Sequence, residues 1–213
     1  KIRIIGDYDV DGICATYILF KGLSFMGAGQ YEKAISAFQT ALSNADMFPG
    51  DLEYDINYYM AVCYFKLDQY NEAIDVYDAI VELRPKDAEA YYLRGNMKLY
   101  VNDLEGAIAD FDMAVSFNKK NYSIYMDIYE AMVNHGYQDA ANQYLDVVLT
   151  ADADDISSYD KGRLCYYQKD YTRACTYLET ARQTEGKVDA DLVILLGECY
   201  KLVDNYKLYQ VPS

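Results

Sequence analysis

Apolar residues recur every three or four positions along most of the chain, which places their side chains on one face of an α-helix. The pattern therefore predicts an all-α protein built from amphipathic helices that are joined by short turns. The first residues differ from the rest, because the apolar run at Lys1–Ile5 is suited to a buried strand.

One amphipathic segment occurs five times. Its copies lie at 29–42, 68–81, 102–115, 135–148 and 169–182. Each has a small residue near its middle, namely Ala34, Ala73, Ala107, Ala140 and Ala174, at spacings of 39, 34, 33 and 34 residues. Seven residues further on stand Ala41, Ile80, Ala114, Val147 and Ala181. The offsets place these residues on one stripe of a helix, and the alanines allow a second helix to approach closely.

A second apolar helix precedes each copy, and a sixth occurs near the end of the chain. These helices are predicted at 17–26, 56–65, 90–99, 124–133, 158–167 and 193–202. Small residues mark their close crossing points at Gly22, Ala61, Gly95, Gly162 and Gly197, whereas the fourth helix has the larger Tyr129 there. Two helices joined by a turn thus form the repeating unit.

This repeat of about 34 residues resembles the tetratricopeptide repeat over roughly residues 15–209. The resemblance implies a right-handed superhelical solenoid of antiparallel helix pairs, with about five repeats and a partial sixth in a domain at 14–213. The longer first spacing predicts a loop around Asn44–Glu53, and the second helix of the sixth unit is expected to end after Tyr206.

The segment 1–23 resembles the first motif of the DHH-type phosphoesterases, the RecJ-like group, in its apolar run followed by Asp-x-Asp-x-Asp-Gly. In that family the aspartates that match Asp7, Asp9 and Asp11 lie at a divalent-metal site. The Asp-His-His motif of the family does not occur, and no later α/β pattern supplies partner strands. We therefore expect 1–13 to be a non-functional fragment, and the following helix, from about Cys14 to Gly27, to serve as the first helix of the solenoid.

Composition narrows the function further. The 213 residues carry a net charge of −15, which argues against nucleic acid as a partner. No apolar run is long enough for membrane insertion. Five cysteines form no CxxC pair and are expected to be buried thiols. Reduced thiols favour the cytoplasm, although a secreted or surface-anchored form with a removed signal peptide stays open, as does the oligomeric state.

The side chains available do not predict an enzyme. The single histidine, His135, stands in an expected turn, and no phosphate-binding or nucleophile motif occurs. We expect no cofactor, no catalytic residue and no metal site, with Asp7, Asp9 and Asp11 as the alternative metal ligands.

In the tetratricopeptide repeat family, the first helix of each unit lines a concave groove. Matching the offsets places twelve residues of four repeats in that groove, and Ile194 and Glu198 extend it in the sixth unit. The twelve are Tyr58, Val62, Phe65, Tyr92, Asn96, Leu99, Met126, Glu130, Val133, Tyr159, Arg163 and Tyr166.

The groove is rich in tyrosine and apolar residues, which suits a protein or peptide partner. Arg163, together with the neutral amide of Asn96, supplies too little positive charge to hold a C-terminal carboxylate. The predicted function is a protein-binding scaffold. The alternatives are a fragment of, or fusion to, a metal-dependent phosphoesterase and a purely architectural, self-associating repeat protein. Nine other tyrosines are expected to fill the core: Tyr31, Tyr64, Tyr70, Tyr77, Tyr137, Tyr144, Tyr171, Tyr200 and Tyr206.

Overall fold

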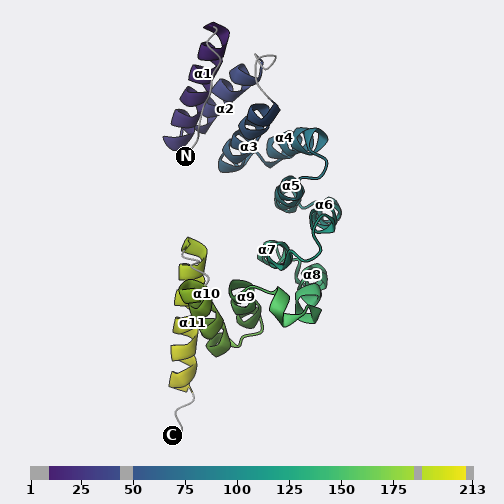
Figure 1. The fold of residues 1–213 in the computed structure, drawn as a ribbon, viewed down its shortest axis with the longest axis vertical. Helices are drawn as coiled ribbons and strands as arrows, with labels where there is room; N and C mark the ends of the chain where they lie inside the picture. Colours follow the sequence, from purple (N-terminus) through teal and green to yellow (C-terminus); the bar gives the residue numbers. More distant parts are fainter. Residues whose placement is uncertain (1–9, 44–49, 185–188, 210–213) are drawn as a thin grey trace. The chain divides into compact units, whose positions relative to one another are not determined.

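The computed structural model describes residues 10–43, 50–184 and 189–209 (Figure 1). These residues form eleven α-helices and a short 3₁₀ helix, and none of them lies in a strand. The predicted all-α fold is confirmed. The strand expected at Lys1–Ile5 lies outside the described residues, as do Asp7 and Asp9.

The helices follow the predicted order. Their bounds are α1 Val10–Gly27, α2 Tyr31–Leu42, α3 Gly50–Lys66, α4 Tyr70–Leu83, α5 Ala88–Tyr100, α6 Leu104–Ser116, α7 Tyr122–Asn134, α8 Gln138–Thr150, η2 Ala153–Asp155, α9 Ser158–Tyr167, α10 Tyr171–Thr184 and α11 Ala190–Tyr209. Helix α1 begins earlier than the expected Cys14 and includes Asp11. Helix α3 begins at Gly50, so the loop predicted around Asn44–Glu53 extends too far at its C-terminal end.

Consecutive helices pack in pairs, α1 with α2 and so on to α9 with α10, and α11 packs against α10 (Figure 1). The chain divides into two compact units at Phe117 and Asn118. Unit 1 contains α1 to α6, and unit 2 contains α7 to α11. We describe each unit separately.

The turn inside each helix pair has the same backbone geometry. One residue adopts a positive φ, and the backbone N–H of the next residue donates to the carbonyl oxygen five positions before it, as Gln69 does to Tyr64. This is the Schellman ending of a helix, which reverses the chain within few residues. The positive-φ residues are Gly29, Asp68, Asn102, Gly136 and Lys169, with φ between 57° and 84°.

The small residues at the crossing points are required by packing. A Cβ added at Gly95 would lie 2.6 Å from Cε1 of Phe111, and one added at Gly162 would lie 2.6 Å from Cγ of Leu178. Both facing side chains are fully buried. At Gly197, by contrast, an added Cβ would meet nothing within 4 Å, because the described residues include no second helix after α11.

The fourth repeat is displaced by one residue from the predicted register. Ala141 and Val148 are buried, whereas Ala140 is half-buried and Val147 is 37% exposed. The positive-φ residue lies five positions before the buried alanine in every repeat, and in the fourth repeat it is Gly136. The turn therefore sets the start of the helix, so the choice of Ala140 and Val147 as core positions was wrong.

The tyrosines expected in the core differ in burial. Tyr77 and Tyr144 are buried, as predicted. Tyr200 is 46% exposed, because α11 has no paired helix among the described residues to cover it. The side chain of Tyr206 lies outside the described part, and the remaining predicted core tyrosines are half-buried.

Candidate functional site

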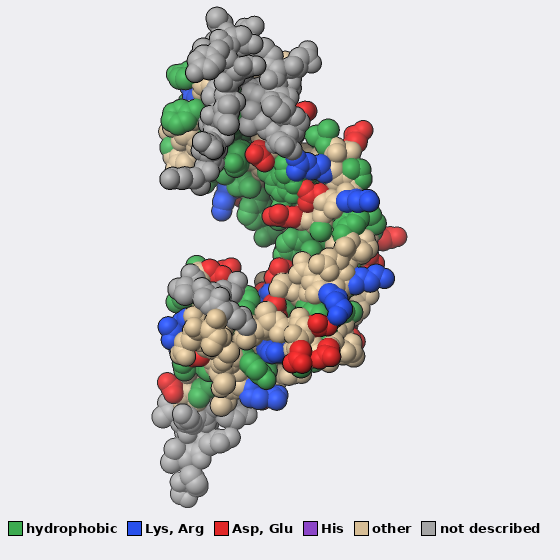
Figure 2. All heavy atoms as spheres, in the orientation of Figure 1, with side chains coloured by type: hydrophobic (Ala, Val, Ile, Leu, Met, Phe, Trp, Pro, Cys, Tyr) green, Lys and Arg blue, Asp and Glu red, His purple; other side chains and the backbone are tan. Residues whose placement is uncertain are grey.

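The predicted groove residues of unit 1 lie on α3 and α5. Tyr58 packs edge-on against Tyr54 and Tyr77, with ring centroids 4.8 and 6.0 Å apart. Tyr92 packs 6.1 Å from the ring of Phe111. These rings are anchored by neighbours and yet keep part of their surface exposed. Figure 2 shows hydrophobic side chains gathered over α3 to α5.

One polar atom on these helices, Oδ1 of Asn96, is buried without a hydrogen-bond partner in the described structure. Leaving such an acceptor unpaired costs about 1–3 kcal/mol. Burial, together with the neighbouring hydroxyl of Tyr54, raises the pKa of Tyr58 well above its ordinary value, so the phenol stays protonated.

A cluster of aromatic rings lies at the end of α3. The sequence pattern did not predict that these rings contact one another. Phe65, a predicted groove residue, lies 6.1 Å from Tyr70 and 5.6 Å from Tyr100. Tyr70 and Tyr100 stack with centroids 4.5 Å apart, and Tyr100 is 40% exposed. Three aromatic side chains from α3, α4 and α5 thus form one partly exposed apolar patch.

In unit 2 the predicted groove residue Arg163 lies at the centre of an ion-pair network, in which Arg163 and Asp160 are buried. Its Nε lies 2.6 Å from Glu130, its Nη2 lies 2.7 Å from Asp127 and its Nη1 lies 3.2 Å from Asp160. Asp160 also accepts hydrogen bonds from the hydroxyls of Ser123 and Ser157. The guanidinium is therefore committed to carboxylates of its own chain.

The structure removes three residues from the predicted groove. Leu99 and Met126 are 1% and 0% exposed, and Arg163 is 3% exposed. Side chains so buried offer no surface to a partner, so their assignment to the groove was wrong. A helical offset gives the side of the helix on which a residue lies, but it does not show whether neighbouring elements cover that side. The burial of Arg163 also means that its guanidinium is not available to clamp a partner's carboxylate.

The remaining predicted residues of unit 2 join α9 to its neighbours. The hydroxyl of Tyr166 donates to Oε2 of Glu198 on α11 at 3.2 Å. The ring of Tyr159 lies 5.5 Å from the Arg163 guanidinium, and burial raises the pKa of Tyr159 to about 12. Both tyrosines keep part of their surface exposed, as does Val133.

Residues with metal-binding or nucleophilic chemistry are dispersed over the described structure. In this part no three His, Cys, Asp or Glu side chains are placed to hold a metal ion. The four described cysteines, Cys63, Cys165, Cys175 and Cys199, are free and buried, as predicted. His135 is the C-cap residue of α7, and its Nδ1 lies 2.8 Å from the carbonyl oxygen of Ala131. The side chain is half-buried, whereas an exposed turn histidine was expected.

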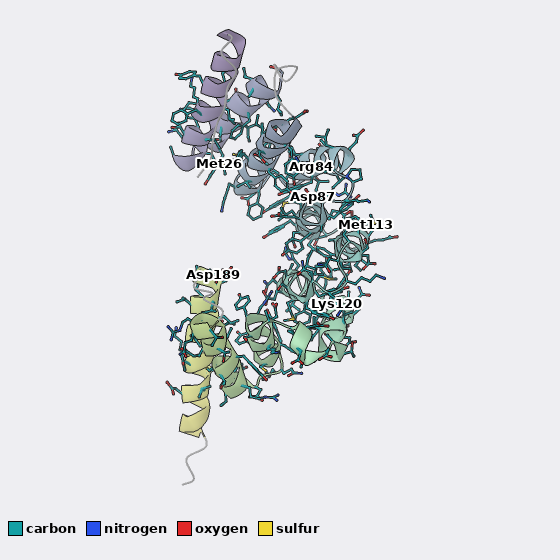
Figure 3. All side chains as sticks on the ribbon, in the orientation of Figure 1. Met26, Arg84, Asp87, Met113, Lys120 and Asp189 are labelled. Atoms are coloured by element: carbon teal, nitrogen blue, oxygen red, sulfur yellow. The ribbon has the colours of Figure 1, made fainter. Side chains whose placement is uncertain are left out.

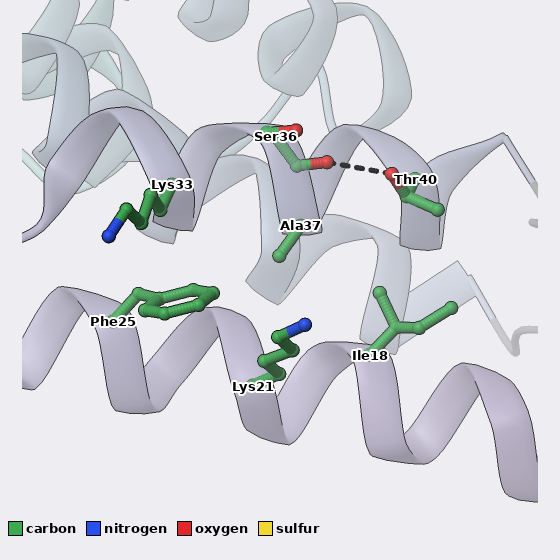
Figure 4. Close-up of a pocket in the computed structure, with 7 residues that line it drawn as sticks. All are labelled: Ile18, Lys21, Phe25, Lys33, Ser36, Ala37 and Thr40. Atoms are coloured by element: carbon green, nitrogen blue, oxygen red, sulfur yellow. Dashed lines mark hydrogen bonds between the residues drawn. The ribbon is translucent and has the colours of Figure 1, made fainter.

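A shallow pocket of about 300 Å³ lies between α1 and α2 (Figure 4). The ammonium groups of Lys21 and Lys33 lie 5.6 and 5.8 Å from the ring centroid of Phe25. The hydroxyl of Thr40 donates to the carbonyl oxygen of Ser36 at 2.8 Å. These contacts are typical of surface side chains that pack on an aromatic ring.

Residues 25–97 match the sequence model of the tetratricopeptide repeat. The fold is similar to a crystal structure of MamA, with a TM-score of 0.56, 18% identity and coverage of 93% of this chain and 97% of that chain. It is also similar to TTC0263, a thermophilic tetratricopeptide repeat protein of Thermus thermophilus, with a TM-score of 0.56, 17% identity and coverage of 87% and 98%.

A third similar structure is MamA from residue 41 to its end, from Desulfovibrio magneticus RS-1. Its TM-score is 0.52 at 22% identity, with coverage of 63% of this chain and 73% of that chain. At these identities the likeness shows the fold, which is that of a tetratricopeptide repeat solenoid. Among the described residues, no helix has both the length and the apolar character needed to span a bilayer.

Proposed function

We propose that this chain, with its tetratricopeptide repeat fold, is a protein-binding scaffold that holds a peptide segment of its partner on the first helices of the repeats. The proposed contact residues of unit 1 are Tyr58, Val62, Phe65, Tyr92 and Asn96. Those of unit 2 are Glu130, Val133, Tyr159 and Tyr166. Capture requires no bond to be made or broken.

The observation that carries this proposal is that each unit has partly exposed aromatic side chains on the first helices of its repeats, on α3 and α5 in unit 1 and on α9 in unit 2. Tyr58, Phe65 and Tyr92 belong to unit 1, and Tyr159 and Tyr166 belong to unit 2. Tyrosine provides a large contact area, loses little entropy when it is immobilised and keeps a hydroxyl for hydrogen bonding. Because neighbouring rings hold these side chains in place, less ordering is required on binding.

Peptide selection tests the proposal even though the partner is unidentified. A phage-displayed random 12-residue library is panned on the full chain, and the affinities of selected peptides are measured by fluorescence polarisation. Truncation of a central aromatic residue of an interface costs about 2 kcal/mol, or about 30-fold in Kd. We expect this loss for Tyr92→Ala or Tyr159→Ala, according to which unit a peptide occupies.

The matched control is Tyr17→Ala, since Tyr17 is 64% exposed on α1, a helix that carries none of the proposed contact residues. Circular dichroism establishes that each variant is folded. Equal affinity of the selected peptides for all three variants would contradict the proposal, and so would failure of the library to yield any binding peptide.

A further inference from the structure

Three first helices of unit 2 form one continuous surface. Arg163 on α9 contacts Asp127 and Glu130 on α7, and Tyr166 on α9 bonds Glu198 on α11. We call it the α7–α9–α11 face. Its apolar part consists of Val133, Tyr159, Tyr166 and Ile194, of which Ile194 is 61% exposed.

The charges of this face are arranged in layers. The side chain of Arg163 is 4% exposed, whereas those of Asp127 and Glu130 are 43% and 30% exposed. The positive group therefore lies beneath the surface, and the negative groups lie above it. A molecule that approaches this face meets carboxylates before it meets the guanidinium.

Carboxylates gather along the whole face. Asp189 and Asp191, at the start of α11, add their charge to that of Glu130 near Tyr159. Figure 3 shows Asp189 at this end of α11. The acidic set is Asp127, Glu130, Asp160, Asp189, Asp191 and Glu198. Their charges add to one another because they lie on three helices that pack side by side.

Basic groups on the same face are few. Arg163 is the basic residue that forms ion pairs with the acidic set. Lys161 also belongs to α9, but an offset of two residues places it on a different side of that helix from Tyr159 and Arg163. The exposed Lys201 lies three residues after Glu198 and seven after Ile194, so it stands on the same side of α11 and offsets part of the charge of Glu198. Arg163 and Lys201 together still do not balance the six carboxylates of the acidic set.

The contact with Arg163 does not hold the pKa of Asp127 down. That pKa is above its ordinary value because partial burial in the first place, and then the nearby charges of Glu130 and Asp160, outweigh the guanidinium nitrogen 2.7 Å away. A further positive charge on this face would be attracted by these neighbouring carboxylates.

We propose that the α7–α9–α11 face binds a basic peptide segment, with a Lys or Arg side chain lying against the ring of Tyr159 among the surrounding carboxylates. This inference rests on the proposed function and specifies its partner. The ring supplies a cation–π contact, and the carboxylates supply charge-assisted hydrogen bonds. The exposed Ile194 and the half-buried Val133 pack against the apolar part of the segment.

The peptides selected on the full chain provide the first test. We expect the peptides that lose affinity on Tyr159→Ala to contain Lys and Arg at least twofold more often than the unselected library. Their affinity should also fall with rising salt, since exposed charges are screened.

Charge-neutral variants provide the second test. Asp191→Asn combined with Glu198→Gln removes two carboxylates of the face and leaves the contacts of Arg163 intact. The glutamine still accepts the Tyr166 bond. We expect Kd to rise about tenfold. The matched control is Asp75→Asn combined with Glu82→Gln, which makes the same charge change at exposed positions of α4 in unit 1 and should alter Kd less than twofold.

The outcomes separate this inference from the function on which it rests. Peptides without Lys or Arg enrichment that still require Tyr159 would overturn the basic partner and leave the scaffold function standing. An equal loss in both double variants would also overturn it, because the attraction would then come from the overall charge of −15. A library that yields no binding peptide would overturn both.

Discussion

Glycine at the helix crossing of the fifth repeat provides a direct test of the packing. In Gly162→Ala, the new Cβ would lie 2.6 Å from Cγ and 2.7 Å from Cδ2 of Leu178, which is fully buried. Alanine favours a helix interior over glycine by about 1 kcal/mol. Overpacking a filled core costs about 1–3 kcal/mol. The clash should exceed the helix preference, so we expect a net loss of about 1 kcal/mol in the free energy of unfolding.

Gly197 is the matched control, because it occupies the equivalent position of α11 and has open space where the Cβ would be. Gly197→Ala should gain the helix preference without a clash and should stabilise the chain by about 1 kcal/mol. The two variants should therefore differ by about 2 kcal/mol. For a chain of this size each kcal/mol shifts Tm by about 2–4 °C, so their melting temperatures should differ by about 4–8 °C.

The assay is thermal and urea unfolding followed by circular dichroism at 222 nm. Because repeat arrays can unfold in more than one step, the two variants are compared on the transition that reports unit 2. Equal stabilisation by both substitutions would refute the assignment of Gly162 as a close crossing point and of Gly197 as an uncovered one.

Three further predictions concern unit 2. Ala141→Leu should lower the free energy of unfolding by about 1–3 kcal/mol, whereas Ala140→Leu should change it little, which thermal melts would distinguish; equal effects would contradict the revised register. Arg163→Ala should cost about 3 kcal/mol in urea unfolding, because it leaves Asp160, 1% exposed, without its guanidinium. The pKa of Tyr159 is raised to about 12 in the folded chain, against about 10 for unfolded tyrosine, so its contribution to stability is complete below pH 10 and is lost as pH rises toward 12. Tyr159→Phe should reduce the alkaline fall of the urea midpoint.

The partial exposure of several proposed contact residues could be predicted from the sequence, because a helical offset fixes the side of the helix on which a residue lies. The offset predicted accessible positions for Tyr58, Tyr92 and Tyr159, and all three are partly exposed. It could not show that Met126 is covered or that Arg163 is consumed by ion pairs. Burial and pairing depend on neighbouring helices, which a single offset does not include.

A signal for the ion-pair network was nevertheless present in the sequence. Glu130 and Arg163 occupy equivalent positions of consecutive first helices, and so do Asp127 and Asp160. Opposite charges at equivalent positions of neighbouring repeats indicate a pair across the helix interface. The opposite charges at these equivalent positions therefore indicate that Arg163 is a structural residue.

By itself, the sequence determined the helical repeat, the pairing of consecutive helices and the need for small residues at Gly95 and Gly162, since all three follow from spacing along a helix. Tertiary structure decided the register of the fourth repeat, where the turn at Gly136 prevails over the pattern of apolar residues. It also decided which polar groups are exposed: α7 and α9 together cover Arg163 and leave Asp127 and Glu130 at the surface. The physical reason is that periodicity describes one helix, whereas burial and charge pairing depend on the helices packed against it.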